Sequence, residues 1–129
     1  LRWLDIWNER RRVVAHRYCA GLSGMAELAL PDMSADAEPS WHLYVVRTPY
    51  RDALQQVLLK RGVEALIHYP VPPLRQGVYA GLALPPSSFP VADRLAEEVL
   101  SLPIGPHLDE RGTLRVLEEV TNSMNLLAG

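Results

Sequence analysis

The sequence predicts a small α+β domain with a sheet of three or four strands and helices packed against it. Its centre is a strand–helix–strand unit over residues 41–69, followed by a third short strand at residues 100–104 that prolines stop. Residues 41–47 and 63–69 are short and rich in β-branched and aromatic residues, which is typical of strands. Because both faces of these strands carry apolar side chains, we expect them to be central and covered on both sides.

The segment between these strands predicts a helix over residues 49–61. Thr48 is the expected N-cap, Pro49 the first helical residue, and Gly62 the left-handed residue at the end. Helical spacing is shared by Ala53, Leu54, Val57, Leu58 and Arg61. Connecting two parallel strands takes about a dozen residues or more, and this helix supplies them. We therefore expect the two strands to be parallel, with the third strand between them in the opposite direction.

The chain before this unit predicts one helix and one edge strand. Residues 1–22 show apolar positions at helical spacing. These positions are Trp3, Trp7, Val14, Tyr18 and Leu22. Residues 25–30 are the expected edge strand, and a polar loop joins them to the central unit.

The chain after this unit predicts a proline-dense loop and two helices. The loop spans residues 70–90 and contains an expected helical turn near residues 76–82. A helix over residues 90–100 follows, with Val91, Leu95, Ala96 and Val99 on its buried side. Asp109 is the expected N-cap of the last helix, whose apolar side consists of Leu114, Leu117, Val120 and Met124.

Composition limits the classes of function. A chain of 129 residues is enough for one domain, and a net charge of −2 gives no reason to expect nucleic acid or an anionic membrane. No apolar run is long enough for a membrane span. The single cysteine, Cys19, excludes an internal disulfide and is typical of a reducing compartment, so we expect a cytoplasmic protein. The chain begins at Leu1 inside a helical pattern, so we expect it to be part of a longer protein.

Few residues are candidates for chemistry. The four histidines show no metal-binding spacing, and one cysteine excludes a zinc site of the CxxC type. The sequence has no GxSxG, Walker A or GxGxxG motif. Lys60 is the only lysine, and Cys19 is interpreted as a buried inert thiol. His68, at the end of a strand and next to Tyr69, is the strongest candidate, because ligands tend to bind at strand ends. From composition and spacing alone, the function of the domain remains open.

The order of motifs resembles a known family. The motifs are RRRVVAHRYCAGL at residues 10–22, WHLYVVRTPYRDALQQVLLKRGV at 41–63, IHYPVPPLRQGVYA at 67–80 and EEVLSLPIGPHL at 97–108. Together they resemble the C-terminal small domain of the DegT/DnrJ/EryC1/StrS aminotransferases. These are fold-type I, pyridoxal-phosphate enzymes that act mostly on nucleotide-linked keto sugars. The resemblance covers nearly all of the chain.

The resemblance implies that residues 1–129 are one small domain and that an N-terminal cofactor-binding domain is missing. The catalytic lysine, the carboxylate for the pyridine nitrogen and most phosphate contacts belong to that missing domain. It follows that this chain has no catalytic residue and binds no cofactor, and that Lys60 is not the Schiff-base lysine. The full enzyme is expected to be a homodimer. Without the large domain, an apolar face around Trp3, Trp7 or the proline loop should be exposed.

The substrate-binding candidates are His68, Tyr69 and Arg75. By resemblance, His68 and Tyr69 lie near the mouth of the active site and contact the nucleotide sugar, and Tyr79 is a more remote candidate. Family members often carry a second histidine after the prolines, where this chain has Leu74 followed by Arg75. Arg75 is interpreted either as a bidentate ligand of a diphosphate or as an exposed side chain.

Two alternatives to a sugar aminotransferase remain open at this stage. Within the same family, some relatives dehydrate sugars and others aminate carbocycles, and the residue that separates the dehydratases replaces the catalytic lysine outside this chain. Alternatively, the chain is a stand-alone binding or dimerisation module that shares the fold of the small domain.

Overall fold

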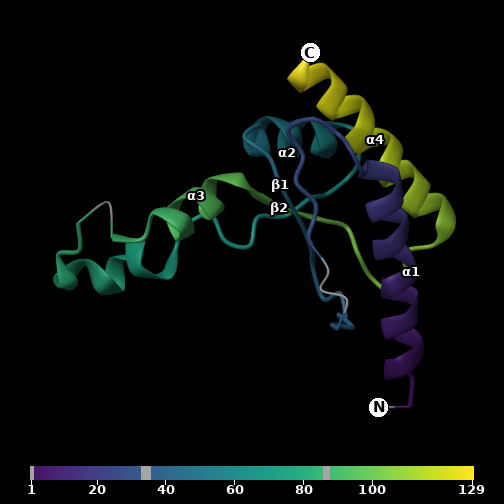
Figure 1. The fold of residues 1–129 in the computed structure, drawn as a ribbon, viewed down its shortest axis with the longest axis horizontal. Coiled ribbons are helices and arrows are strands. Elements are labelled where there is room, and N and C mark those ends of the chain that lie inside the picture. The colour runs from purple at the N-terminus through teal and green to yellow at the C-terminus, as the bar shows by residue number, and fades with distance from the viewer. Residues whose placement is uncertain (1, 33–35, 86–87) are drawn as a thin grey trace.

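The computed structural model describes residues 2–32, 36–85 and 88–129 and confirms the α+β class. The elements are α1 (Leu4–Leu22), β1 (Tyr44–Arg47), α2 (Arg51–Lys60), the 3₁₀ turns η1 (Pro73–Arg75) and η2 (Gly77–Leu82), α3 (Pro90–Glu98), β2 (Val99–Leu102) and α4 (Glu110–Ala128). In Figure 1, α1, α2, α4 and the two strands form a body, and η1, η2 and α3 extend from it to one side. We call this extension, residues 73–98, the arm.

The sheet has two strands among the described residues, fewer than the three or four predicted. β1 and β2 are antiparallel and pair Tyr44 with Leu102 and Arg47 with Val99. Each remaining predicted strand contributes one antiparallel bridge, Ala29 to Arg47 and Leu66 to Ser101. If the pairing of Leu66 with Ser101 continued, Pro103 would lie opposite residue 64. Proline has no N–H to donate, which limits this pairing.

The predicted arrangement of the central segments is nevertheless confirmed. β2 is antiparallel to β1 on one side and to the bridge segment around Leu66 on the other. The segment around Leu66 therefore runs parallel to β1, with β2 between them. The short strand predicted at residues 100–104 is thus the centre of the sheet, although it begins one residue earlier, at Val99.

The core lies where α1, α2 and α4 meet the sheet. It is built from aliphatic side chains around two tyrosines, Tyr18 and Tyr44, whose rings meet edge to face at 5.1 Å. The Tyr18 hydroxyl donates to the Pro103 carbonyl at 2.7 Å. The Tyr44 hydroxyl lies 3.2 Å from Cys19 Sγ. Burial is the main cause that raises the pKa of both tyrosines above the ordinary value of 10.0, so both stay protonated at pH values where an exposed tyrosine ionises.

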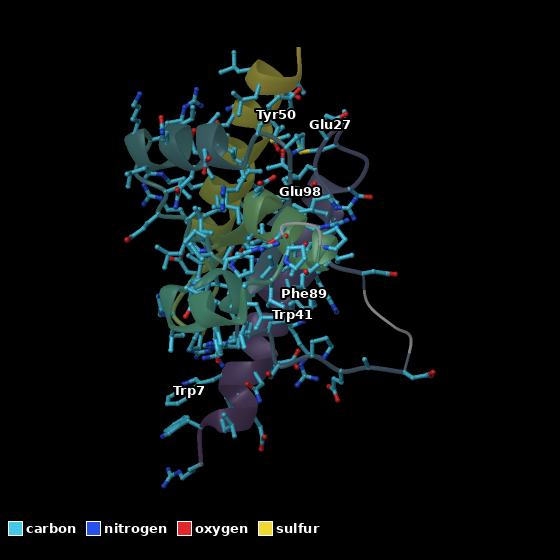
Figure 2. The ribbon with its side chains drawn as sticks, turned by 90° about the vertical axis from the view of Figure 1, so that its left-hand side faces the viewer. Trp7, Glu27, Trp41, Tyr50, Phe89 and Glu98 are labelled. Carbon is cyan, nitrogen blue, oxygen red and sulfur yellow. The ribbon has the colours of Figure 1, made fainter. Side chains whose placement is uncertain are left out.

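α1 is confirmed as a helix, but only part of its predicted apolar side is buried. Val14, Tyr18 and Leu22 are in the core. Trp3 and Trp7 are 53% and 44% exposed, because the first turns of α1 extend beyond the body. Figure 2 shows Trp7 near the free end of this helix. Exposure of these side chains agrees with the expectation of an open apolar face, and residue 1 lies outside the described residues.

The predicted start of α2 is wrong, whereas its end is confirmed. The Thr48 N–H donates to the Glu98 carbonyl at 3.1 Å, so Thr48 still belongs to the β1 side of the sheet. Its hydroxyl accepts the Tyr50 N–H at 3.2 Å, and the helix begins only at Arg51, two residues after Pro49. Gly62 has a φ of 76°, the left-handed conformation that ends a helix.

The predicted buried sides of α3 and α4 are confirmed only in part. In α3 only Ala96 is buried, because the helix belongs to the arm and faces no other layer over most of its length. In α4, Asp109 is the predicted N-cap and its Oδ1 accepts the Gly112 N–H at 2.7 Å. The buried side is Thr113, Val116, Val120, Ser123 and Met124, which confirms the predicted Val120 and Met124. Leu117 is partly buried against the core, whereas Leu114 is exposed, so the prediction is wrong only at Leu114.

Candidate functional site

His68 lies at the root of the arm, beside β2. Its Nδ1 atom is 2.9 Å from the hydroxyl oxygen of Ser101, a buried residue of β2 that forms the bridge with Leu66. Alternation along an extended segment places Leu66 and His68 on one face, and this placement brings His68 to the side chain of Ser101. His68 is half-buried, so one part of its ring remains accessible.

A cavity of about 160 Å³ adjoins this pair. Its lining residues are His42, Leu43, Glu64, Leu66, His68, Ser101, Leu102, Pro103 and Ile104. Five of these residues are apolar and four carry polar or charged groups, and the volume is smaller than that of a whole small-molecule pocket, so the cavity has room for only part of a ligand. No group of three or more metal-ligating side chains occurs among the residues that the structure describes.

Tyr69 extends outward from His68. The two rings meet edge to face with centroids 5.5 Å apart, and Tyr69 is 72% exposed. The peptide bond between them is cis. The two predicted residues therefore form one pair in which His68 is anchored on the sheet and Tyr69 projects into solvent. An exposed ring beside an anchored imidazole can contact a ligand without further rearrangement of the body.

Arg75 is held by α3. Its Nε and Nη2 atoms donate to the two carboxylate oxygens of Asp93 at 3.0 and 2.7 Å, and Nη1 lies 3.4 Å from the Pro85 carbonyl. Hydrogen bonding to Arg75 lowers the pKa of Asp93 below its usual range, and the same bonds raise the pKa of Arg75. The bidentate side of the guanidinium thus faces a carboxylate of this chain, and Arg75 joins η1 to α3.

The other candidates lie on exposed surface. Tyr79 is on η2 in the arm and is 42% exposed. Lys60 is the last residue of α2 and is exposed. Cys19 is half-buried rather than fully buried, beside Tyr44. No helix among the described residues has the length and apolarity needed to cross a bilayer.

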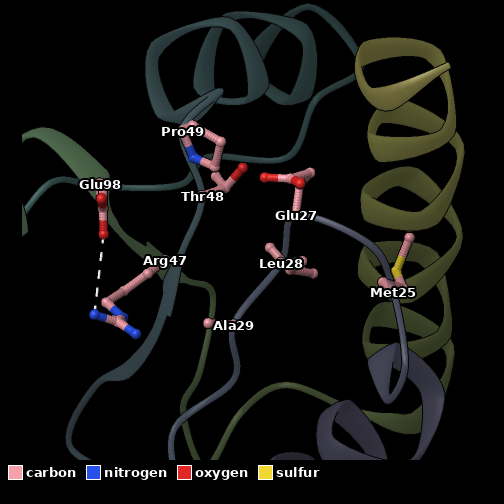
Figure 3. Close-up of a pocket in the computed structure, with 8 residues that line it drawn as sticks. All are labelled: Met25, Glu27, Leu28, Ala29, Arg47, Thr48, Pro49 and Glu98. Atoms are coloured by element: carbon pink, nitrogen blue, oxygen red, sulfur yellow. Dashed lines mark ion pairs between the residues drawn. The ribbon is translucent and has the colours of Figure 1, made fainter.

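A second hollow, of about 500 Å³, lies beside the end of β1 and is drawn in Figure 3. It includes Glu27, Arg47 and Glu98, and its basic group is already opposed by an acidic one, with Arg47 Nη1 3.9 Å from Glu98 Oε2. None of the predicted site residues lines it. The cavity at His68 is therefore the candidate site.

Sequence reasoning missed Ser101 and Asp93. Ser101 is 33 residues from His68, and Asp93 is 18 residues from Arg75. The only signal for Ser101 was its place as the polar residue inside the short strand before Pro103. That signal identifies a side chain without its partner, because the bridge to Leu66 depends on how the segments assemble.

Comparison with known proteins agrees with the motif order. The family model described as "DegT/DnrJ/EryC1/StrS aminotransferase family" matches residues 1–121. The chain belongs to this family. It is 48% identical over 117 residues to the dTDP-3-amino-3,4,6-trideoxy-alpha-D-glucose transaminase of Streptomyces venezuelae, covering 91% of this chain and 31% of that protein. It is 49% identical over 117 residues to the erythromycin biosynthesis sensory transduction protein EryC1 of Saccharopolyspora erythraea, covering 91% and 32%.

A solved structure of this family has the same fold. The crystal structure of S. venezuelae DesV in complex with a ketimine intermediate superposes with a TM-score of 0.93 at 46% identity. The superposition covers 96% of this chain and 33% of that one. The chain thus spans about a third of the length of the relatives that it matches.

The family depends on pyridoxal phosphate, and the residues that the structure describes do not fit a site for that group. A Schiff base needs a lysine inside a cavity. Lys60 is exposed at the end of α2 and lines none of the cavities described above. The lining of the His68 cavity contains no lysine or arginine that would hold a phosphate.

Proposed function

We propose that this chain is the C-terminal small domain of a pyridoxal-phosphate-dependent aminotransferase that acts on a nucleotide-linked keto sugar. The single observation that carries the proposal is the 48% identity to a transaminase named for a dTDP-linked amino sugar. The family match over residues 1–121 supports it. Transamination of this kind uses the cofactor to carry an amino group between an amino acid and the keto sugar.

In this proposal the chain recognises the substrate and does not hold the cofactor. His68 and Tyr69 contact the nucleotide sugar, because they form an anchored pair beside a cavity at the root of the arm. Arg75 contributes indirectly, because the bidentate side of its guanidinium is bound to Asp93. While that ion pair is intact, Arg75 acts by holding η1 against α3 and so orienting the arm.

The exposed apolar surfaces pack against the rest of the enzyme in this proposal. The exposed apolar side chains of the arm are Val78, Tyr79, Leu82, Phe89 and Val91, and Val71 is exposed just before it. The first turns of α1 expose Trp3, Leu4, Ile6 and Trp7. A domain that spans a third of its relatives has such surfaces where the remaining two-thirds, or the second subunit of a homodimer, would cover them.

The test uses the full-length enzyme that contains this chain. We expect turnover of a dTDP-linked amino sugar with an α-keto acid as amino acceptor, and a visible cofactor absorbance that borohydride removes. The Lys60→Ala variant should keep both, because the lysine that binds the cofactor would lie outside this chain. Loss of the absorbance in this variant, or absence of turnover in the wild type, would contradict the proposal.

The role of His68 has its own test. In the full-length enzyme, His68→Ala should lower kcat/KM for the sugar by roughly 10- to 100-fold, the range for losing a hydrogen bond to a charged group. The matched control is His16→Ala, which removes an exposed imidazole from α1. Unchanged kinetics per folded enzyme, with a lowered melting temperature, would make His68 a structural residue instead.

A further inference from the structure

Ser101 holds the segment that carries His68 through three of its polar groups. Its N–H donates to the Leu66 carbonyl at 2.7 Å, and its carbonyl accepts the Leu66 N–H at 3.1 Å. Two residues that exchange both hydrogen bonds in an antiparallel pair have side chains on the same face of the sheet. Side chains alternate along an extended segment, so His68, two residues after Leu66, lies on that face as well. His68 is therefore diagonal to Ser101, and the Ser101 hydroxyl closes the third contact, at 2.9 Å from Nδ1.

This contact determines which ring nitrogen of His68 is available to a ligand. Nδ1 is engaged by the hydroxyl, whereas Nε2 has no hydrogen-bond partner among the residues that the structure describes. The ring of Tyr69 also contacts the imidazole edge to face, with centroids 5.5 Å apart. A half-buried imidazole held at one nitrogen presents the other nitrogen in a defined direction.

The direction of the hydrogen bond follows from the surroundings of Ser101. The side chain is 4% exposed, and within the described part of the chain His68 Nδ1 is the one acceptor for its hydroxyl. If Nδ1 carried the proton and donated, the buried hydroxyl hydrogen would lack an acceptor, which is unfavourable. The hydroxyl therefore donates to Nδ1, so the neutral ring carries its hydrogen on Nε2.

We propose that Ser101 is a positioning residue for substrate recognition: its hydroxyl orients His68 so that Nε2–H donates to an oxygen of the bound nucleotide sugar. This inference rests on the proposed function, in which His68 contacts that substrate. An N–H donor suits the phosphate and hydroxyl oxygens of such a ligand. Ser101 itself is buried in β2 and acts only through His68.

The test is a double-mutant cycle in the full-length enzyme. The variants are Ser101→Ala, His68→Ala and the combination of both, and the probe is dTDP-3-amino-3,4,6-trideoxy-α-D-glucose in the reverse direction. Ser101→Ala should raise KM and lower kcat/KM by roughly 3- to 10-fold, the effect of one neutral hydrogen bond. In the His68→Ala background the same substitution should change nothing further, because its effect passes through the imidazole.

Two controls separate positioning from stability. Ser123→Ala removes another buried hydroxyl, which has no hydrogen-bond partner within the described residues, and should leave the kinetics unchanged. Ser101→Thr keeps a hydroxyl at the same place and should retain most of the kcat/KM. The melting temperature of each variant shows the folded fraction to which the rates refer.

The outcomes distinguish the inference from the proposed function. A large effect of His68→Ala with wild-type kinetics in Ser101→Ala, or losses that multiply in the double variant, would overturn the positioning role alone. Wild-type kinetics in His68→Ala would overturn substrate contact by His68, and the positioning role with it. Absence of turnover in the wild type would overturn the proposed function.

Discussion

The body and the arm of this chain are stabilised by different means. In the body, side chains from α1, α2, α4 and the strands form one core, and Leu54, Leu58 and Leu100 are fully buried. In the described part of the arm, residues 73–85 and 88–98, only Ala96 is buried, and Val78 is 81% exposed. Figure 1 shows the arm extending away from the three helices of the body.

Local contacts and polar anchors hold the arm in place of a core. The 3₁₀ turn η1 begins at Pro73 directly after Pro72, and these prolines restrict the backbone. Arg75 joins η1 to α3 through Asp93, and the buried Arg51 of α2 donates to the Ala96 carbonyl at 3.0 Å. The comparison shows that apolar residues alone do not define a core, since many apolar side chains in the described part of the arm are exposed.

The largest expected effect compares the same substitution in the two regions. Leu58→Ala removes a fully buried side chain from the body and should lower the free energy of unfolding by about 2–5 kcal/mol. Leu82→Ala in the arm, at a side chain that is 58% exposed, should change it by less than about 0.5 kcal/mol. Urea denaturation of both variants measures the difference. Equal losses would show that the arm has a core of its own.

A smaller effect is expected for the Tyr18 hydroxyl, which joins α1 to Pro103 in the lining of the His68 cavity. Tyr18→Phe leaves the Pro103 carbonyl without its donor and should cost about 1 kcal/mol, whereas Tyr79→Phe in the arm should cost nothing measurable. Thermal unfolding of the two variants gives the comparison.

The same tyrosine makes the body sensitive to alkaline pH. Burial raises the pKa of Tyr18 above its ordinary value of 10.0, so its contribution is complete below pH 10 and is lost as the pH rises above it. The loss between pH 10 and 11 should be smaller in Tyr18→Phe than in the wild type. An equal loss in both proteins would show that Tyr18 does not titrate on unfolding.

The smallest expected effect concerns the anchor of the arm. Asp93→Asn should speed hydrogen exchange in residues 73–98 at neutral pH and leave the body unchanged. Because Arg75 lowers the pKa of Asp93, the contribution of this carboxylate is present above its ordinary value of 3.8 and is lost as the pH falls below it. The wild type and the variant should therefore converge in acid. Glu97→Gln, at an exposed position of α3, is the matched control and should behave as the wild type.

Much of the local structure was predictable because it depends on neighbours in sequence. Asp109 caps α4 through an N–H three residues away, and Gly62 ends α2 because of its own backbone. The N-cap role of Thr48 was wrong for the opposite reason. Its N–H donates to the carbonyl of Glu98, fifty residues away, so Thr48 belongs to the sheet, and the helix begins at Arg51.

The sequence by itself determined the α+β class, the order of the helices, the central place of the segment at residues 100–104 and the pairing of His68 with Tyr69. These follow from periodicity, turn residues and adjacency, which act over a few residues. Only the tertiary structure decided that Leu114 of α4 is exposed, that α3 belongs to an exposed arm, and that Ser101 and Asp93 bind His68 and Arg75. Those outcomes depend on which segments meet in space, and a pattern along one segment carries no information about its distant partner.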